Sequence, residues 1–374
     1  MLTLKKNVII ILIDGGRIDF AMKSPSFLNL QSNFVFFSQS ITYAPYTLGA
    51  MHAVFSGCYG NRTGTNSYWS SYKFKSQNFV TLTEYLSAFE YYTCADIHSE
   101  IIIPKQGFDD FIIYNEDNED VTKRHCNLIE KISNKNKRFF LYLHYSKIHT
   151  EIKNEVLKKY TNFSNEYFEN KEFNTQRYAE LFRNAEIYID QIMNTIEDLE
   201  LLENSVILIL SDHGTSVGEK IGERAYGAFC YDYTLKTFAY LYTPDITPKT
   251  ISSQVRHVDF MPTILDYLKI ELDLDYENLD GESLLPLIHG NQMPEKIAFS
   301  ETGNPRNESQ PPKEPNVKAI RTSKWKLIHN DYDKTDELYD LENDPSEVNN
   351  LIGKNLEIEK ELFSVLLTYT NNKN

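Results

Sequence analysis

The stretch Val8-Ile-Ile-Ile-Leu-Ile13, followed directly by Asp14-Gly-Gly-Arg17, decides the fold class of this chain. Six consecutive apolar residues, most of them β-branched, are typical of a parallel strand that is buried on both faces. The segments Arg138-Phe-Phe-Leu-Tyr-Leu-His144 and Val206-Ile-Leu-Ile-Leu210 predict two further strands by the same criterion. The chain therefore has several candidate strands for one buried sheet.

Between the second and third of these strands the sequence predicts one long helix. Its apolar residues fall at three- and four-residue steps and form a single stripe. These residues are Leu181, Ala185, Tyr188, Ile189, Ile192, Met193, Ile196 and Leu199. A strand, a helix and a strand in succession predict a crossover connection and a parallel sheet, so we expect an α/β fold.

The residue composition and the predicted elements change near residue 300. The tail predicts, in order, a loop at 304–316, short strands at 318–329, a turn at 337–341 and a final helix at 357–369. We expect residues 301–374 to form a small antiparallel subdomain packed on a catalytic domain of residues 1–300. Within the latter, residues 150–177 show no clear period and predict an irregular insertion near the site.

Composition limits the partners of the chain. Its 374 residues carry a formal net charge of −15 with a pI near 5.1. No basic excess exists to neutralise phosphates, which argues against nucleic acid as a partner. A small anionic substrate would need a local cation, and a bound metal ion is the obvious source.

The cysteines and the N-terminal segment indicate in which cellular compartment the protein is expected. Four scattered cysteines without a Cys-x-x-Cys pair predict no disulfide framework and fit a reducing environment. The apolar run Val8–Ile13 is far shorter than the roughly 20 residues of a membrane helix. It lacks a signal-peptide cleavage pattern and ends in Asp14. We expect a soluble, cytoplasmic protein without membrane insertion. The sequence does not predict its oligomeric state.

Polar residues with metal-ligand or oxyanion chemistry follow the three predicted strands. The first ends in Asp14-Gly-Gly-Arg17, the second runs into His144 and His149, and the third into Ser211-Asp-His-Gly214. In an open parallel sheet, the loops at the carboxyl ends of the strands form the ligand crevice. Each motif alone is also an ordinary turn with a capping aspartate. Together, Asp14, Asp212 and His213 predict a hard cation site with mixed oxygen and nitrogen ligands.

A candidate nucleophile, Thr47, lies in the segment Ala44–Gly57, which predicts a loop that enters a short helix at about Leu48. Thr47 would lie at the helix N-terminus, where free amides and the helix dipole favour an anionic group. Contact with a cation would favour its alkoxide and activate it. Taken alone, the segment favours the simpler interpretation of Thr47 as a helix cap.

Taken together and in order, these segments resemble the sulfatase family of the alkaline phosphatase superfamily along nearly the whole chain. The motifs that carry the resemblance are Asp14-Gly-Gly-Arg17-Ile-Asp19, Pro45–Gly57 with Gly60–Gly64, Phe139–His149, Tyr178–Asp190, Ser211–Gly214, Val255–Leu268, Leu279–Leu285, Ile320–Ile328 and Glu337–Pro345. The resemblance implies an alkaline-phosphatase-like three-layer αβα sandwich with a mostly parallel sheet and a small C-terminal antiparallel subdomain.

The resemblance also implies roles for individual residues. Asp14, Asp212 and His213 would bind one divalent cation, with Thr47 as a further ligand and as the attacking group. Arg17 would steady the nucleophile or the transferred group. His149 would contact the substrate or the leaving group, and Lys147 is a further candidate contact for an anionic substrate, although a solvated loop lysine is as good an interpretation. A covalent phospho- or sulfo-threonine would pass to water or another acceptor.

One departure from the family pattern concerns the nucleophile. Sulfatases of the usual type carry a cysteine that is oxidised to formylglycine, whereas this chain has Thr47, and Cys58 lies too far downstream to replace it. A threonine cannot release sulfate by elimination, as an aldehyde hydrate does. We therefore favour hydrolysis or transfer of phosphate esters. A sulfatase that uses Thr47 directly, and a non-catalytic anion-binding member, remain the alternatives.

A second departure concerns the metal. Gly15 stands where many relatives carry another aspartate, which weakens a Ca²⁺ site, while His213 suits Mn²⁺ or Zn²⁺. We favour Mn²⁺ or Zn²⁺, with Ca²⁺ and Mg²⁺ as alternatives. A second ion would need His149, His257 or His52, and packing or surface roles are the simpler interpretation of each.

The substrate pocket has the weakest sequence signal. Gly227 occupies the position of a lysine that many sulfatases present, and Lys220 and Arg224 are the nearby basic residues, for which surface positions are the simpler interpretation. Tyr68, Trp69 and Tyr72 favour either a sugar pocket or core packing. We expect a small anionic ester as substrate, with a glycan or phosphoglycan precursor as one candidate.

Overall fold

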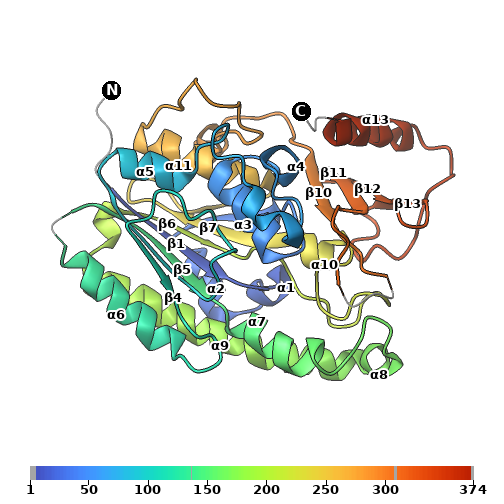
Figure 1. Ribbon diagram of the computed structural model, residues 1–374, viewed down its shortest axis with the longest axis horizontal. Helices are drawn as coiled ribbons and strands as arrows, with labels where there is room; N and C mark the ends of the chain where they lie inside the picture. The colour runs from blue at the N-terminus through green and yellow to red at the C-terminus, as the bar shows by residue number, and fades with distance from the viewer. Residues whose placement is uncertain (1–5, 136, 307–309, 372–374) are drawn as a thin grey trace.

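The computed structural model describes residues 6–135, 137–306 and 310–371. A large sheet forms the centre of the molecule (Figure 1). Its nine strands are β1 (Asn7–Ile13), β2 (Val35–Ile41), β3 (Tyr92–Ile97), β4 (Asp110–Ile113), β5 (Phe139–Tyr145), β6 (Ser205–Leu210), β7 (Lys236–Tyr242), β8 (Lys249–Ile251) and β9 (Val255–Arg256). The three strands predicted from sequence are β1, β5 and β6, and all three are confirmed.

The strand order of this sheet is β4-β3-β5-β1-β6-β7-β2-β8, with β9 paired to β2. Strands β4, β3, β5, β1 and β6 run parallel, and β7 is antiparallel to both of its neighbours. Strand β1 lies between β5 and β6, with Leu12 opposite both His144 and Leu210. The predicted crossover and the mostly parallel sheet are therefore confirmed.

Strand β1 is buried on both faces, because helices cover both sides of the sheet. Ile9, Ile11 and Ile13 pack into one apolar core, and Val8, Ile10 and Leu12 pack into the other. The first core is covered by α1 (Ile18–Ala21), α2 (Pro25–Leu30), α6 (Val121–Ser133), α7 (Lys147–Ile152) and α9 (Lys171–Asp198). The second is covered by α3 (Thr47–Ser56), α5 (Leu82–Ala88), α11 (Phe260–Leu268) and α12 (Leu285–Ile288). The three-layer αβα arrangement follows from this double burial.

The helix between β5 and β6 is longer than the apolar stripe that predicted it. Helix α9 buries most of the predicted stripe, from Ala185 to Ile196, but it begins ten residues before Leu181, at Lys171. The prediction of an irregular insertion at 150–177 is wrong. The last residues of α7, a π-helix η2 (Lys153–Leu157), α8 (Asn165–Glu169) and the first turns of α9 occupy that segment. Few of its residues are buried, so no apolar period marks these helices.

A four-stranded antiparallel sheet forms the C-terminal part, as predicted. Its strands are β10 (Ala298–Thr302), β11 (Val317–Arg321), β12 (Trp325–Asn330) and β13 (Thr335–Asp340), and helix α13 (Glu357–Asn371) follows. The predicted turn at 337–341 is wrong, because residues 335–340 pair with β12 as a strand. Of the predicted loop at 304–316, residues 307–309 lie outside the described part. The division at residue 300 stays a prediction.

Buried charges join the C-terminal sheet to the main body. Asp232, in α10 (Asp232–Leu235), accepts hydrogen bonds from Arg321 at 2.8 Å and from Lys326 at 2.6 Å. Lys326 also pairs with Glu347 at 2.8 Å, and the Lys326 side chain is wholly buried. Two cations and two carboxylates thus neutralise one another between β11, β12 and α10. This pairing keeps the small sheet in one position relative to the main sheet.

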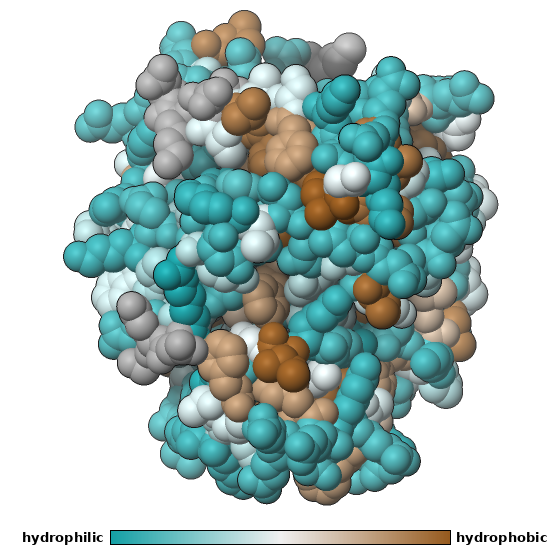
Figure 2. Space-filling view, turned by 90° about the vertical axis from the view of Figure 1, so that its right-hand side faces the viewer, coloured by the Kyte–Doolittle hydropathy of each residue, from teal (hydrophilic) through white to brown (hydrophobic). Residues whose placement is uncertain are grey.

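The remaining short elements are α4 (Gly60–Thr63), η1 (Tyr68–Lys73), η3 (Leu202–Asn204) and η4 (His257–Asp259). Among the residues that the structure describes, no helix is long and apolar enough to cross a membrane. Figure 2 shows one face of the molecule, which is mostly hydrophilic with small, separate apolar patches. The four cysteines are free thiols.

Candidate metal and nucleophile site

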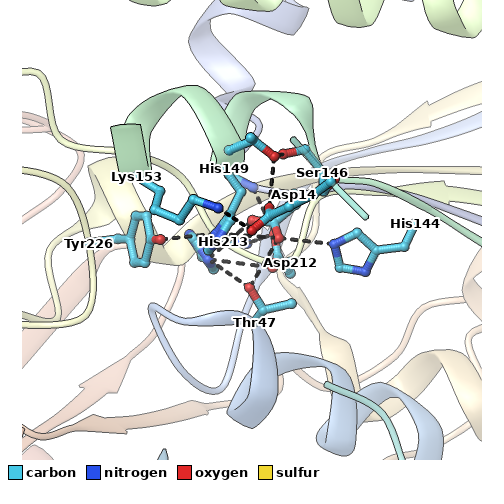
Figure 3. A network of polar contacts seen from close by, with 12 residues as sticks. Asp14, Thr47, His144, Ser146, His149, Lys153, Asp212, His213 and Tyr226 are labelled. Atoms are coloured by element: carbon cyan, nitrogen blue, oxygen red, sulfur yellow. Dashed lines mark hydrogen bonds and ion pairs between the residues drawn. The ribbon is translucent and has the colours of Figure 1, made fainter. Parts of the chain in front are cut away.

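The candidate site lies at the carboxyl ends of adjacent parallel strands. Asp14 follows β1, His144 lies near the end of β5, and Asp212 and His213 follow β6. Helix α3 points its first residue, Thr47, at the same place (Figure 3). Because neighbouring parallel strands end at one edge, residues nearly 200 positions apart come together there.

The four predicted metal ligands form one cluster. Thr47 Oγ1 lies 3.4 Å from Asp14 Oδ2 and 3.4 Å from His213 Nε2. His213 Nε2 lies 3.4 Å from Asp212 Oδ2 and 3.8 Å from Asp14 Oδ1. The Thr47 side chain is 6% exposed, and the other three residues are fully buried. The structure therefore brings together the set predicted from sequence.

A left-handed turn at Gly15 ties the ends of β1 and β6 together. Gly15 has a φ of +72°, and its N–H donates to Asp212 Oδ1 at 3.0 Å. The hydroxyls of Tyr178 and Thr215 donate to its carbonyl at 2.7 and 2.9 Å. A Cβ at this position would lie 3.0 Å from Thr215 Oγ1. Both the backbone conformation and the available space therefore favour glycine at this position.

The orientation of the ligand atoms fits a cation. His213 Nδ1 lies 2.8 Å from the carbonyl of Gly214, so Nδ1 carries the proton and the Nε2 lone pair faces the cluster. Within the described part of the chain, Asp14 Oδ1 and Asp212 Oδ2 are buried and have no hydrogen-bond partner. Buried carboxylate oxygens without partners are costly. A divalent cation held by three oxygens and one nitrogen would satisfy all of them.

The two carboxylates titrate in opposite directions. Burial raises the pKa of Asp14, but His149, His144 and His213 lower it, and the net pKa lies well below its usual range. Burial and the neighbouring Asp14 charge raise the pKa of Asp212. Two carboxylates that share a buried site oppose each other's ionisation, and a cation between them removes that conflict.

The start of helix α3 presents Thr47 to this cluster. Tyr46 is the N-cap, and its side chain makes no cap hydrogen bond to the first amides of the helix. Gly49 lets the preceding loop approach, because a Cβ there would lie 2.6 Å from that of Ala44. The predicted start at about Leu48 is correct to within one residue. Thr47 is the first helical residue, not the cap.

His149 approaches Asp14 from helix α7. Its Nδ1 lies 3.7 Å from Asp14 Oδ2 and 3.0 Å from the hydroxyl of Tyr226. Its side chain is 21% exposed, which leaves it open to a ligand from solvent. Figure 3 shows His149, Tyr226 and Lys153 on one side of the cluster. The structure thus places His149 where the sequence predicted a substrate contact.

Arg17 and Lys147 lie close in sequence to the site but contact other groups. The Arg17 guanidinium pairs with Asp19 at 2.9 Å and with Glu219 at 2.6 Å. It also donates to the Thr215 carbonyl. These partners use its donors, so the structure does not bring it against the nucleophile as predicted. Lys147 donates to the carbonyl of Glu116 at 2.7 Å instead of facing the metal ligands.

The other candidates from the sequence have ordinary structural roles. His257 contacts the Thr237 hydroxyl at 3.0 Å, and His52 is buried inside α3 beside Phe74. Lys220 packs over Tyr231, and Arg224 pairs with Asn162 at 2.7 Å. Cys58 is buried, and burial raises the pKa of its thiol to about 12. None of these five residues lies among the metal ligands.

Four further residues lie near the site, and only His144 among them was singled out from the sequence. His144 Nε2 lies 3.0 Å from Asp14 Oδ2, and the His98 ring lies 4.6 Å from the His144 ring. Tyr226 packs 4.6 Å from the His213 ring, and Lys153 pairs with Glu116. His144 had a signal, since it ends a predicted strand beside Asp14. His98, Tyr226 and Lys153 had none, because their positions depend on neighbouring strands and loops.

A mostly parallel sheet with carboxylates, histidines and a hydroxyl at its carboxyl edge defines an α/β protein with a candidate metal centre. The sulfatase family model matches residues 6–270. A second model, described as N-sulphoglucosamine sulphohydrolase, C-terminal, matches residues 226–371. The first match covers more than half of the 374 residues, so the chain belongs to the sulfatase family of the alkaline phosphatase superfamily.

Curated relatives match parts of the chain. N-acetylglucosamine-6-O-sulfatase of Bacteroides thetaiotaomicron is 32% identical over 192 residues, 48% of this chain and 32% of the relative. Choline-sulfatase of Rhizobium meliloti is 27% identical over 163 residues, 44% of this chain and 30% of the relative. These matches thus span about a third of each relative.

Solved structures share the whole fold. A structure in complex with its substrate D-glucosamine-2-N,6-O-disulfate has a TM-score of 0.76 at 19% identity, covering 99% of this chain and 98% of the other. The phosphonate monoester hydrolase of Agrobacterium radiobacter has a TM-score of 0.76 at 13% identity, covering 99% and 96%. At these identities the likeness establishes the fold.

Proposed function

We propose that this chain is a metal-dependent hydrolase or transferase of phosphate esters that acts through a covalent phosphothreonine at Thr47. The observation that carries the proposal is the position of the Thr47 hydroxyl, 3.4 Å from both Asp14 Oδ2 and His213 Nε2. Family membership and the likeness to a phosphonate monoester hydrolase support ester hydrolysis as the reaction class.

The ligands in this proposal are Asp14, Thr47, Asp212 and His213, which would hold one divalent cation. Three oxygens and one imidazole nitrogen suit Mn²⁺ or Zn²⁺ better than Ca²⁺ or Mg²⁺. When bound, the cation supplies positive charge that favours the alkoxide of the nucleophile and offsets charge on the transferred group. The four ligand residues are buried, and burial strengthens such interactions.

The remaining chemistry belongs to side chains of this chain. The Thr47 hydroxyl gives its proton to solvent, its oxygen attacks phosphorus, an O–P bond forms, and the bond to the leaving oxygen breaks. We assign His149 as the proton donor to that oxygen. Burial raises the pKa of Tyr226 well above its usual value, so its hydroxyl stays neutral and can accept from His149 Nδ1–H at 3.0 Å. The imidazolium then gives its Nε2 proton to the leaving oxygen and ends as a neutral imidazole. Water or another acceptor then attacks the phosphothreonine and restores the hydroxyl.

Arg17 and Lys147 have indirect roles in this proposal. Arg17 would act as a positioning residue, because it joins Asp19 and Glu219 beside the Gly15 turn. Lys147 would steady the loop that carries Glu116. Neither residue needs to touch the transferred group for the scheme to work.

Hydrolysis of sulfate esters is the second candidate function. The names of the relatives, choline-sulfatase and N-acetylglucosamine-6-O-sulfatase, favour it. Thr47 weighs against it, because a sulfothreonine has no second hydroxyl through which sulfate can be eliminated. A structural neighbour bound to a disulfated glucosamine supports a sugar-linked ester as the substrate class in either case. The half-exposed Trp69 in η1 is a candidate stacking surface for such a sugar.

Turnover of two model substrates tests the proposal. Purified protein with added Mn²⁺ should hydrolyse bis-p-nitrophenyl phosphate faster than p-nitrophenyl sulfate. Thr47→Ala should abolish turnover while metal stays bound through the three remaining ligands, and Thr47→Ser should restore part of it. Thr368→Ala, at an exposed position of α13, is the matched control and should behave as wild type.

The other outcomes are equally informative. Faster turnover of the sulfate ester would select the sulfatase alternative. Bound metal without turnover of either ester would select a non-catalytic, anion-binding member of the family. Full turnover by Thr47→Ala would remove the nucleophile assignment altogether.

A further inference from the structure

A second cluster of ligand atoms lies on the other side of Asp14. Strands β3, β5, β1 and β6 are consecutive neighbours in the sheet and run parallel. Their carboxyl ends deliver His98, His144, Asp14 and then Asp212 in the same order. The cation site proposed above uses the β1 and β6 ends. The β3 and β5 ends contribute two imidazoles that this site does not use.

The geometry of this second cluster suits a metal ion. One ligand atom each from Asp14, His98 and His144 lies within 4.8 Å of the others. His144 Nε2 lies 3.0 Å from Asp14 Oδ2, and the His98 and His144 rings are 4.6 Å apart at a steep angle. Two imidazoles and one carboxylate with an open position form a common donor set of catalytic zinc sites.

The surroundings of these residues point to a missing partner. His98 Nδ1 is buried and, among the described residues, has no hydrogen-bond partner. The hydroxyl of Tyr142 lies 3.0 Å from His144 Nδ1. A hydroxyl that accepts the Nδ1 proton would leave the Nε2 lone pair of His144 free for a metal, as is usual for metal-binding histidines. His149 lies 5.2 Å from His98, ring to ring, and closes the cluster towards solvent.

We propose that Asp14, His98 and His144 hold a second divalent cation, with Zn²⁺ preferred, so that Asp14 bridges two metal ions. This inference rests on the proposed function for the first ion. Asp14 Oδ1 lies 3.8 Å from His213 Nε2, whereas Oδ2 lies 3.0 Å from His144 Nε2 and 3.4 Å from Thr47 Oγ1, so the Asp14 carboxylate lies between the two ligand sets. Carboxylate-bridged pairs, with ions roughly 3.5–4 Å apart, clamp both oxygens of an in-line displacement.

The charge of the ligand residues predicts how binding of the second ion depends on a bound anion. The second site shares its one carboxylate with the first, so a second divalent ion brings an uncompensated positive charge. An anion at the substrate position would supply the missing negative charge. Coupling between two bound ligands is reciprocal, so the oxyanion should raise the affinity for the second ion, and the ion should raise the affinity for the oxyanion. We expect each affinity to rise about tenfold.

Metal stoichiometry tests the inference without reference to activity. Chelator-treated protein is dialysed against buffered Zn²⁺, with and without inorganic phosphate, and metal per chain is measured by mass spectrometry. Wild type should bind two ions, and His98→Ala and His144→Ala should each bind one. His289→Ala, which removes an exposed histidine outside the site, should still bind two. Phosphate should tighten the second ion in wild type.

Each alternative result has a defined meaning. One ion in wild type, unchanged in both histidine variants, would overturn the second site and leave the proposed function intact. It would make His144 a hydrogen-bond partner of Asp14 alone. No bound ion in wild type would overturn the proposed metal dependence as well. His144 is fully buried, whereas His98 is only half-buried. If His144→Ala fails to fold, the His98→Ala variant decides the test.

Discussion

The backbone N–H of Gly15 donates to Asp212 Oδ1 at 3.0 Å, across 197 positions of sequence. This hydrogen bond joins the turn after β1 to the turn after β6 and orients the Asp212 carboxylate. Its other oxygen, Oδ2, then faces His213 Nε2 at 3.4 Å. The backbone of residue 15 thus helps to hold one of the candidate metal ligands in place.

Replacing this glycine should be costly. Gly15→Ala adds a Cβ 3.0 Å from Thr215 Oγ1 to a residue with a φ of +72°. We expect a loss of about 2–3 kcal/mol in the free energy of unfolding, measured by chemical denaturation. Gly353→Ala is the matched control, because Gly353 has a φ of +75° and nothing within 4 Å of its Cβ position. It should lose only about 1 kcal/mol. Equal losses would show that crowding at Thr215 is unimportant.

The role assigned to His149 predicts a dependence on the leaving group. A proton donor matters little for p-nitrophenolate and much for a more basic alcohol. His149→Ala should therefore lower kcat/KM about 100-fold more for a phenyl ester than for the p-nitrophenyl ester. Tyr226→Phe removes the hydroxyl at 3.0 Å from His149 and should shift the ratio in the same direction, less strongly. A uniform loss across both esters would assign His149 to binding instead of proton transfer.

Glu223 predicts how stability depends on pH. Burial raises the pKa of this carboxyl to about 7, although the N–H groups of Ala228 and Phe229 donate to it at 2.6 and 2.9 Å. Between pH 4.5 and 7 the folded state holds a proton that the unfolded state has lost, so stability falls as pH rises through this window. The size of this fall is about 3 kcal/mol.

Glu223→Gln keeps an oxygen for both N–H donors and removes the titration. Its free energy of unfolding, measured by denaturation between pH 5 and 8, should therefore decline less than that of wild type and exceed it at pH 8. Glu166→Gln, at an exposed position of α8, should leave the wild-type pH dependence unchanged. Parallel curves for wild type and Glu223→Gln would contradict this prediction.

The ion pairs of β12 predict unequal effects of two lysine variants. Lys326 is fully buried between Asp232 and Glu347, at 2.6 and 2.8 Å. Lys326→Met leaves buried carboxylates short of a partner and should cost about 3–5 kcal/mol in unfolding free energy. Lys324, two residues earlier, pairs with Glu342 on the surface, and Lys324→Met should leave the unfolding free energy nearly unchanged, because water screens an exposed ion pair. Similar costs for the two variants would contradict the structural role of this cluster.

Much of the architecture was predictable because burial leaves a direct trace in sequence. A strand covered on both faces must be apolar throughout, as Val8–Ile13 is, and a helix on the sheet must show a stripe, as α9 does from Ala185 onward. Where burial is slight, the trace disappears. The first turns of α9 and the helices at 150–177 were missed for this reason, and β13 was mistaken for a turn.

The candidate site was only partly predictable, for a related reason. Asp14, Thr47, Asp212 and His213 stand in recognisable motifs, and the structure brings them together. Arg17 stands in an equally clear motif, yet Asp19 and Glu219 take up its guanidinium. His98 has no motif and enters the site because β3 lies beside β5.

The sequence alone determined the fold class, the sulfatase-like motifs and the kinds of side chain available for chemistry. Strand burial and local motifs depend on residues that are neighbours in the chain, so the sequence records them directly. Only the tertiary structure decided which strand ends adjoin, where Arg17 points, and that three histidines surround Asp14. Strand order and side-chain direction arise from packing between distant segments, and no local stretch of sequence records that packing.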